Sequence, residues 1–152
     1  MNAHWFDSTA TSTGRRREVE ELLQRVAQWA EKRKDVVGVL LVGSWARQAA
    51  REDSDVDLLL LTEEPRRYDA ASLAEELSLG AFVVNRTWGP VTEWRFVTGS
   101  GLEIEVCVGT PSWADTSPVD PGTRRVVCDG VRPVYDRNEL FAALVAACAQ
   151  DQ

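Results

Sequence analysis

Apolar and polar residues follow two different periods along the first third of this chain. Between residues 15 and 34, apolar residues recur at helical spacing for about five turns, with charged residues on the other face. Val36–Val42 is an almost continuous apolar run with β-branched residues and predicts a buried strand. Residues 54–61, which end in four leucines, predict a second strand. We therefore expect a helix and then two strands, with a short helix over residues 44–51 between the strands.

The later pattern predicts two more helices and further strands. The helices are residues 70–79, which end at Gly80, and residues 138–149. The predicted strands are residues 82–87, 92–98 and 102–108, with another short strand within residues 124–135. The predicted turns and loops are residues 65–68, Gly89-Pro90, Gly99-Ser100-Gly101, which closes a β-hairpin, and the proline-rich residues 109–123. This order predicts an α/β fold in which helices pack on a mixed β-sheet.

Length and composition indicate one domain. The chain has 152 residues, of which 44% are hydrophobic, enough for one ordinary core. Residues 1–14 are polar and predict a flexible N-terminus, which leaves residues 15–152 as a single domain. The sequence lacks an apolar run near the ~20 residues of a membrane span, and residues 1–14 lack the apolar core of a signal peptide. We therefore expect a cytoplasmic protein with no membrane partner.

Charge and metal-binding residue types exclude several classes of function. The net charge of −7 argues against a protein that holds nucleic acid through a basic surface, so nucleic acid is not an expected partner. The three cysteines, Cys107, Cys128 and Cys148, form no Cys-x-x-Cys pair, and the one histidine is His4. We therefore expect neither a zinc site nor a catalytic Ser-His or Cys-His unit.

Residues 42–61 carry the strongest chemical signal. Gly43 and Ser44 follow the first apolar run, and Asp55 and Asp57 begin the second. Two carboxylates at i and i+2 on a strand face the same way and need a counter-charge, for which Mg²⁺ is the usual oxygen-seeking cation. The alternative is a solvated edge strand, but the four leucines that follow indicate burial, where unpaired carboxylates are costly. The Gly-Ser turn offers N–H groups and a hydroxyl to phosphate.

This pattern resembles the nucleotidyltransferase superfamily that includes DNA polymerase beta. It is similar to the minimal nucleotidyltransferases of bacteria and archaea, which share their core with the aminoglycoside nucleotidyltransferases. The resemblance is specific over residues 36–62 and looser to about residue 108. Many of these proteins have glycine where this chain has Gln48, which we expect inside the short helix at little functional cost.

The resemblance implies a Mg²⁺-dependent enzyme with a polymerase-beta-like core. Such an enzyme moves a nucleoside monophosphate from a nucleoside triphosphate to an acceptor hydroxyl and releases pyrophosphate. One or two Mg²⁺ ions are implied, with Mn²⁺ as a substitute. Asp55 and Asp57 would be the catalytic metal ligands, and Gly43 and Ser44 would contact the terminal phosphates.

Two arginines are candidate phosphate ligands. Arg47 and Arg51 lie on the predicted short helix and could approach the triphosphate or the leaving pyrophosphate. Either could equally pair with Glu52 or Asp53 on the surface, where such ion pairs are usually weak.

The third carboxylate of the family lies on a later strand between apolar neighbours. Glu103 and Glu105 both fit this description on one face of the predicted hairpin, and Glu105, deeper in its strand, is the preferred metal ligand. In the family this acid completes the metal site or takes the proton from the attacking hydroxyl. The alternative is a hairpin with one solvated polar face. Glu93, Asp115 and Asp120 are lesser candidates in looser segments.

The sequence leaves the acceptor open, as a small molecule or a protein. Because no helical domain is appended, a homodimer or a partner protein could supply the acceptor surface. Minimal nucleotidyltransferases also occur as antitoxins that act on or through a partner toxin, which is one alternative function. A catalytically degenerate relative that only binds nucleotide is another.

Overall fold

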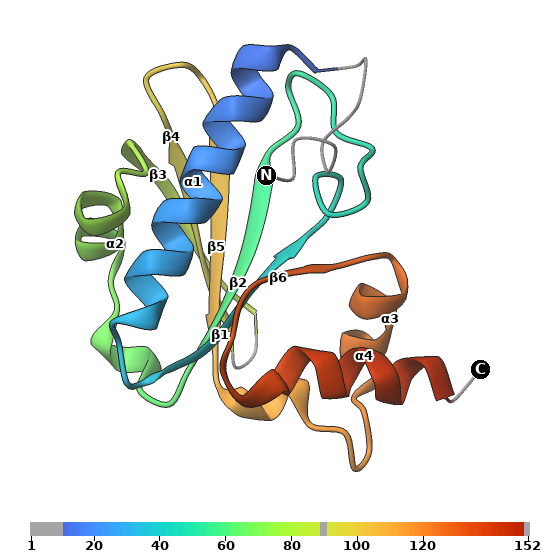
Figure 1. Cartoon of the computed structure of the whole chain (residues 1–152). Coiled ribbons are helices and arrows are strands. Elements are labelled where there is room, and N and C mark those ends of the chain that lie inside the picture. The colour runs from blue at the N-terminus through green and yellow to red at the C-terminus, as the bar shows by residue number, and fades with distance from the viewer. Residues whose placement is uncertain (1–10, 89–90, 151–152) are drawn as a thin grey trace.

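The structure is a computed structural model, and it describes residues 11–88 and 91–150 (Figure 1). Within these ranges the strands are β1 (Val36–Val42), β2 (Val56–Thr62), β3 (Ala81–Trp88), β4 (Val91–Val97), β5 (Glu103–Gly109) and β6 (Arg132–Asp136). The α-helices are α1 (Thr13–Glu31), α2 (Ala70–Leu77), α3 (Pro121–Cys128) and α4 (Leu140–Gln150). Short 3₁₀ helices are η1 (Pro65–Arg67), η2 (Pro111–Ala114) and η3 (Arg137–Glu139).

The strands form one mixed sheet in the order β3-β4-β5-β2-β1-β6. β2 and β5 are parallel, whereas β1–β2, β1–β6, β3–β4 and β4–β5 are antiparallel. The connection from β2 to β5 contains η1, α2 and the β3–β4 pair, which continues the sheet beyond β5. The predicted fold class, helices packed on a mixed sheet, is confirmed.

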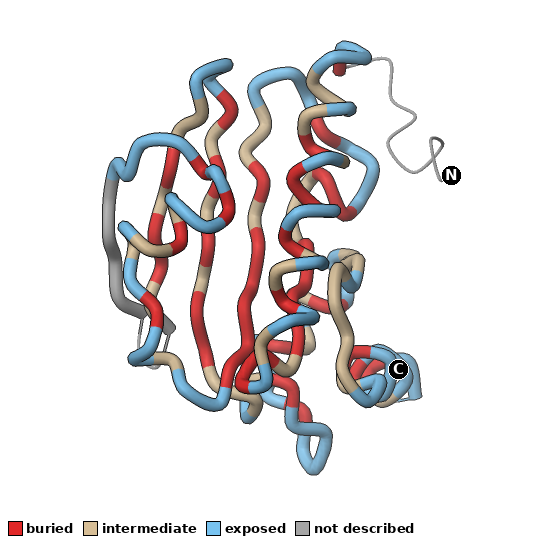
Figure 2. The backbone as a smooth tube through the Cα atoms, turned by 60° about the vertical axis from the view of Figure 1, so that its left-hand side comes forward, coloured by how far each residue is buried: buried red, intermediate tan, exposed pale blue. Residues whose placement is uncertain are grey.

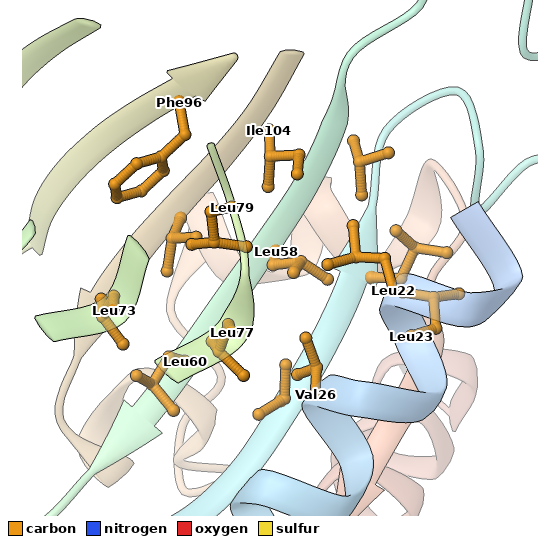
Figure 3. Close-up of a cluster of buried hydrophobic side chains, with 14 of the residues drawn as sticks. Leu22, Leu23, Val26, Leu58, Leu60, Leu73, Leu77, Leu79, Phe96 and Ile104 are labelled. Atoms are coloured by element: carbon orange, nitrogen blue, oxygen red, sulfur yellow. The ribbon is translucent and has the colours of Figure 1, made fainter. Parts of the chain in front are cut away.

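Helices cover both faces of the sheet, and each face has its own core. Leu58 and Leu60 of β2 pack with Leu22, Leu23 and Val26 of α1 and with the leucines of α2 (Figure 3). The alternate leucines, Leu59 and Leu61, pack with α3 and α4 on the opposite face, as the two-residue period of a strand requires. Figure 2 shows buried residues along the central strands and exposed residues in the loops and on the outer faces of the helices. None of the helices in the described ranges has the combined length and apolar character needed to cross a membrane.

The first helix begins earlier than the sequence predicts. The Ser12 side chain accepts a hydrogen bond from the Arg15 N–H, so Ser12 is the N-cap and α1 starts at Thr13. Of the predicted flexible segment 1–14, residues 1–10 lie outside the described part of the chain, and residues 13 and 14 are helical.

The predicted helix over residues 44–51 is wrong. Residues 44–48 form consecutive hydrogen-bonded turns, in which Gly43 O accepts from both Ala46 N and Arg47 N. Gln48 has a φ of 59°, a left-handed conformation that stops helical continuation. Glycine adopts this conformation without steric strain, which explains why glycine suits this position and corrects the expectation that Gln48 lies inside a helix.

A helix also begins inside the predicted loop 109–123. The Asp120 side chain accepts hydrogen bonds from Gly122 N and Thr123 N, and Pro121 occupies the first turn of α3. A proline in that place lacks only an N–H that would have no helical partner, so it starts a helix here. The predicted strand within 124–135 is β6, which follows α3, and the predicted turn at Gly89-Pro90 lies outside the described residues.

Candidate active site

Strand register brings three of the predicted carboxylates together. Asp57 of β2 lies opposite Glu105 of β5 in the parallel pair, and Asp55 immediately precedes β2. Carboxylate oxygens of Asp55, Asp57 and Glu105 all lie within 4.8 Å of one another. Glu103 lies two residues earlier on β5 and is outside this group, with its side chain 45% exposed against 17% for Glu105. We call Asp55, Asp57 and Glu105 the carboxylate cluster.

Burial and mutual repulsion make the cluster hard to ionise. Burial raises the pKa of Asp57 to about 7, and the negative charges of Asp55 and Glu105 contribute to this rise against the opposing charge of Arg95. Burial also raises the pKa of Glu105 to about 7, helped by its hydrogen bond with Glu93 and by the charge of Glu93. The cluster therefore has more negative charge than its surroundings compensate, which is the condition that a bound cation relieves.

Arg95 is the positively charged side chain that contacts this cluster. It lies opposite Glu105 in the β4–β5 register, and its Nη2 donates to Glu105 Oε2 at 2.5 Å. Its Nη1 lies 3.5 Å from Asp55 Oδ2 and 3.8 Å from Glu103 Oε1. Burial would lower the pKa of Arg95, but these three carboxylates outweigh burial and the pKa is raised. Sequence reasoning did not single out Arg95.

Glu93 of β4 is a further acidic residue beside the carboxylate cluster. Glu93 is buried and lies opposite Cys107 in register, and oxygens of Glu93 and Glu105 lie within 4.8 Å of the Cys107 sulfur as one group. The Cys107 thiol faces Glu93 Oε1 at 3.9 Å, and burial, followed by the charges of Glu105 and Glu93, raises its pKa to about 12. Cys107 therefore stays a neutral thiol beside the cluster.

The Gly43 turn packs directly against the cluster. Gly43 has a φ of 78°, and a Cβ at this position would lie 2.5 Å from Asp57 Oδ2. Only glycine combines this left-handed backbone with this close approach to a carboxylate. Ser44 follows and is half-buried, so the predicted phosphate-binding turn and the predicted metal ligands are adjacent in space.

Trp45 fixes the turn to the segment that carries Asp55. Its side chain is only 1% exposed and belongs to the core under α1, and its indole N–H donates to the Ser54 carbonyl at 3.3 Å. Ser54 also accepts a hydrogen bond from Arg51 N at its hydroxyl, at 2.7 Å. These bonds hold both ends of the loop between β1 and β2 in one arrangement.

Arg47 and Arg51 are both exposed, and neither forms an ion pair within the described ranges. Glu52, one of their predicted alternative partners, instead accepts from Ser12 N at 2.7 Å and lies 3.8 Å from Arg15 Nε. Arg47 packs beside Gly130, where an added Cβ would lie 3.1 Å from Arg47 Cγ. Both arginines are therefore exposed on the loop that follows Gly43, and their phosphate-binding role stays a prediction.

The donor set fits a hard divalent cation. Three carboxylates supply only oxygen ligands, which is the preference of Mg²⁺, and the cluster is open enough to leave positions for water and phosphate oxygens. The raised pKa of Asp57 shows that the protein alone does not neutralise the site. Histidine and cysteine ligands, which zinc prefers, are not part of the cluster.

Replacing Arg95 with methionine is expected to strengthen metal binding. The guanidinium and a divalent cation compete for the same carboxylate oxygens, so its removal should tighten Mn²⁺ binding about threefold to tenfold. The same variant should be less stable in EDTA, because the carboxylates lose their counter-charge. Electron paramagnetic resonance of free Mn²⁺ measures the first effect, and urea denaturation in EDTA measures the second.

The control for this prediction is Arg17→Met on the exposed face of α1, which removes one positive charge away from the cluster. It should change neither quantity. Mn²⁺ affinity that falls in Arg95→Met would show that Arg95 supports the metal site instead of competing for it.

Comparison with protein-family models gives a match over part of this chain. Residues 24–82 match the family model described as Polymerase beta, Nucleotidyltransferase. The matched segment contains the Gly43 turn and both aspartates of the cluster, so the resemblance found in the sequence is confirmed over this segment. A search of the curated proteins gives no match to this chain.

Three solved structures illustrate the partial likeness of this chain to longer proteins. Cid1 in complex with its short product ApU is 16% identical with a TM-score of 0.47, and the match covers 69% of this chain and 34% of that chain. Cid1 with the UTP analog UMPNPP is 17% identical with a TM-score of 0.45, covering 70% and 34%. A cytoplasmic RNA terminal U-transferase is 17% identical with a TM-score of 0.47, covering 69% and 33%. The match thus spans about a third of each of these longer proteins.

Proposed function

We propose that this protein is a Mg²⁺-dependent nucleotidyltransferase that moves a nucleoside monophosphate from a nucleoside triphosphate to an acceptor hydroxyl and releases pyrophosphate. The observation that carries this proposal is the packing of Gly43 against Asp57, with oxygens of Asp55 and Glu105 in the same cluster. The turn that would bind phosphate and the carboxylates that would hold the metal are thereby adjacent. The family match over residues 24–82 supports the same class.

Asp55, Asp57 and Glu105 would hold the metal. When bound, Mg²⁺ supplies charge neutralisation for the phosphates and stabilises the attacking and leaving oxygens. The protein's part is to keep these carboxylates aligned: β2 and β5 fix Asp57 and Glu105 through their register, and the Trp45–Ser54 bond fixes the segment before β2. Such positioning supplies much of the rate in phosphoryl transfer chemistry.

The Gly43 turn would hold the terminal phosphates. The absence of a side chain at Gly43 lets phosphate oxygens approach the backbone beside Asp57, and the Ser44 hydroxyl can donate to them. Arg47 and Arg51, exposed on the same loop, would compensate charge on the triphosphate and on the leaving pyrophosphate.

A carboxylate on β5 would receive the proton of the acceptor hydroxyl. Glu103 and Glu105 share one face of β5, and Arg95 contacts both. Where Glu105 is held by metal, the more exposed Glu103 is the available base. The acceptor is an uncharacterised small molecule or protein, and a second copy or a partner protein would complete its binding surface.

Calorimetric titration with each of the four ribonucleoside triphosphates tests this proposal. Each titration is run with Mg²⁺ and with EDTA, on the native chain and on Asp55→Asn/Asp57→Asn. We expect binding that needs Mg²⁺ and that the double variant loses, because both aspartates would be metal ligands. The nucleotide that binds most tightly is the donor, and its label in the α-phosphate then reports transfer to candidate acceptors.

The matched control is Asp53→Asn/Asp115→Asn, which removes two exposed carboxylates outside the cluster and should bind as the native chain does. Failure of every triphosphate to bind the native chain would contradict the enzyme proposal. Mg²⁺-dependent binding without transfer to any acceptor would instead favour a nucleotide-binding relative that works through a partner protein.

A further inference from the structure

A large cavity lies away from the carboxylate cluster, between the C-terminal end of α1, η1 and α2. Its volume is about 650 Å³. Trp29 of α1 forms part of its wall, and five basic side chains line it: Arg25, Lys32, Arg33, Lys34 and Arg67. Two carboxylates, Asp35 and Glu76, also line it. We call this the basic cavity.

Asp35, the first of these carboxylates, already has hydrogen-bond and ion-pair partners within the protein. Asp35 is buried and accepts hydrogen bonds from the Tyr68 hydroxyl at 2.5 Å and the Thr62 hydroxyl at 2.7 Å, and Arg67 lies 3.3 Å from its other oxygen. Burial would raise the pKa of Asp35, but these hydrogen bonds outweigh it and the pKa is lowered. Asp35 is therefore ionised and neutralises Arg67.

The second carboxylate is committed as well. Glu76 of α2 accepts from the Trp29 indole N–H at 2.8 Å and pairs with Arg33 through the same oxygen. The Arg33 guanidinium lies over the Trp29 ring, 4.6 Å from its centre. These contacts hold Trp29 and Arg33 in place along one wall of the cavity. The carboxylate of Glu76 compensates the positive charge of Arg33.

Three positive charges are left over. Arg25 donates its Nε to the Leu77 carbonyl, and among the residues that the structure describes it has no ion-pair partner. Lys32 and Lys34 are exposed, and neither forms an ion pair in residues 11–88 and 91–150. They are the two lysines of the whole chain, and both line this cavity in a protein of net charge −7.

We propose that the basic cavity binds a compact polyphosphate anion. Its volume falls within the range of roughly 300–1,000 Å³ that is usual for small-molecule sites, so a few phosphate groups fill it. Lysine ammonium groups bind phosphate as point charges and an arginine binds two of its oxygens at once, and both are present here. Three surplus charges match a ligand of similar negative charge, such as tripolyphosphate or the phosphate chain of a nucleotide.

This site is separate from the carboxylate cluster. The cavity lies where α1 leads into β1, whereas Gly43 follows the other end of β1 (Figure 1). The seven residues of β1 put these ends on the order of 20 Å apart. The cavity is also on the α1–α2 side of the sheet, while Asp57 shares the opposite face with Leu59. One ligand cannot therefore occupy both sites.

Titration calorimetry with sodium tripolyphosphate in EDTA tests the proposal on the full chain. We expect the native chain to bind, and Lys32→Gln/Lys34→Gln to bind about tenfold more weakly, because two charge-assisted contacts are lost. Both lysines are exposed, so the variant should keep the native thermal midpoint. EDTA removes metal-dependent binding at the carboxylate cluster, so the result does not depend on the proposed enzyme activity.

The matched control is Arg16→Gln/Arg17→Gln, which removes two positive charges from the other end of the same helix and should bind as the native chain does. Equal weakening in both variants would mean that only overall charge matters and would overturn the proposal, as would an absence of tripolyphosphate binding. A parallel titration with a short oligothymidylate separates the two sources of phosphate. Lysine-dependent binding of the oligonucleotide alone would assign the cavity to nucleic acid and overturn the compact ligand.

Discussion

Asp57→Asn is expected to stabilise the metal-free protein while removing most of the proposed metal-dependent nucleotide binding. Because burial and the neighbouring carboxylates raise the pKa of Asp57 to about 7, its ionised form is unfavourable in the folded chain. This penalty is absent below the unfolded pKa of 3.8, grows as pH rises, and is complete above about pH 7. Asparagine removes it, so the variant should gain about 2 kcal/mol near pH 8 and progressively less towards acid pH.

The same substitution removes a proposed metal ligand. Loss of even an outer-shell partner of a metal ligand lowers affinity or activity by about 10–100-fold, so the loss of Asp57 should exceed a hundredfold or so. Urea denaturation in EDTA at several pH values measures the stability difference, and calorimetry with Mg²⁺ and triphosphate measures binding. Asp53→Asn, an exposed neighbour, should alter neither. A destabilised Asp57→Asn in EDTA would mean that the carboxylate serves the fold.

Gly43→Ala is expected to damage both the fold and the site. The left-handed backbone at φ 78° costs a non-glycine residue about 1–2 kcal/mol, and the new Cβ would lie 2.5 Å from Asp57 Oδ2. Asp57 must then move away from Asp55 and Glu105. We expect a loss of about 2–3 kcal/mol in unfolding free energy and at least tenfold weaker Mg²⁺-dependent nucleotide binding.

A double-mutant cycle separates the two causes. In an Asp57→Ala background the close contact with Oδ2 is absent, so Gly43→Ala should cost only the backbone part, about 1–2 kcal/mol. Gly99→Ala is the control, since nothing lies within 4 Å of a Cβ there. An equal cost of Gly43→Ala in both backgrounds would show that Gly43 and Asp57 do not couple.

Local sequence patterns predict the parts of the site that lie close together in the chain. Gly43, Asp55 and Asp57 belong to one loop and its flanking strands, and an apolar run next to a glycine turn defines such a loop without tertiary information. β1 has the predicted bounds, because seven consecutive mainly apolar residues between polar ones fit little else than a buried strand.

Residues that depend on strand register are harder to predict. Choosing between Glu103 and Glu105 requires knowing that β5 pairs with β2 in parallel, which no local pattern contains. The cross-strand partners of Glu105 and Cys107 are easier to predict from the sequence. Counting residues outward from the Gly99–Gly101 turn pairs Arg95 with Glu105 and Glu93 with Cys107. Alternation alone identifies the two strands of the hairpin, whereas the cross-strand partners of Glu105 emerge only from that count.

Two features that the sequence analysis missed have local causes. Helical propensity in residues 44–51 gives way to the burial of Trp45 and its bond to Ser54, which bend the chain into turns. At α3, the sequence Asp120-Pro121 is a helix start, but several prolines nearby favour a loop. In both cases a specific side-chain hydrogen bond determines the local structure more than the average composition of the segment does.

The parallel pairing of β2 with β5 has a consequence for how folding and metal binding would be linked. Asp57 and Glu105 lie on strands that are separated along the chain by α2, β3 and β4, and a slip of one residue between the strands would turn Glu105 to the opposite face. A divalent cation therefore finds its ligands assembled only in a correctly finished sheet. By binding that state alone, the ion would shift the folding equilibrium towards it, so the chain should resist unfolding better when the cation is present.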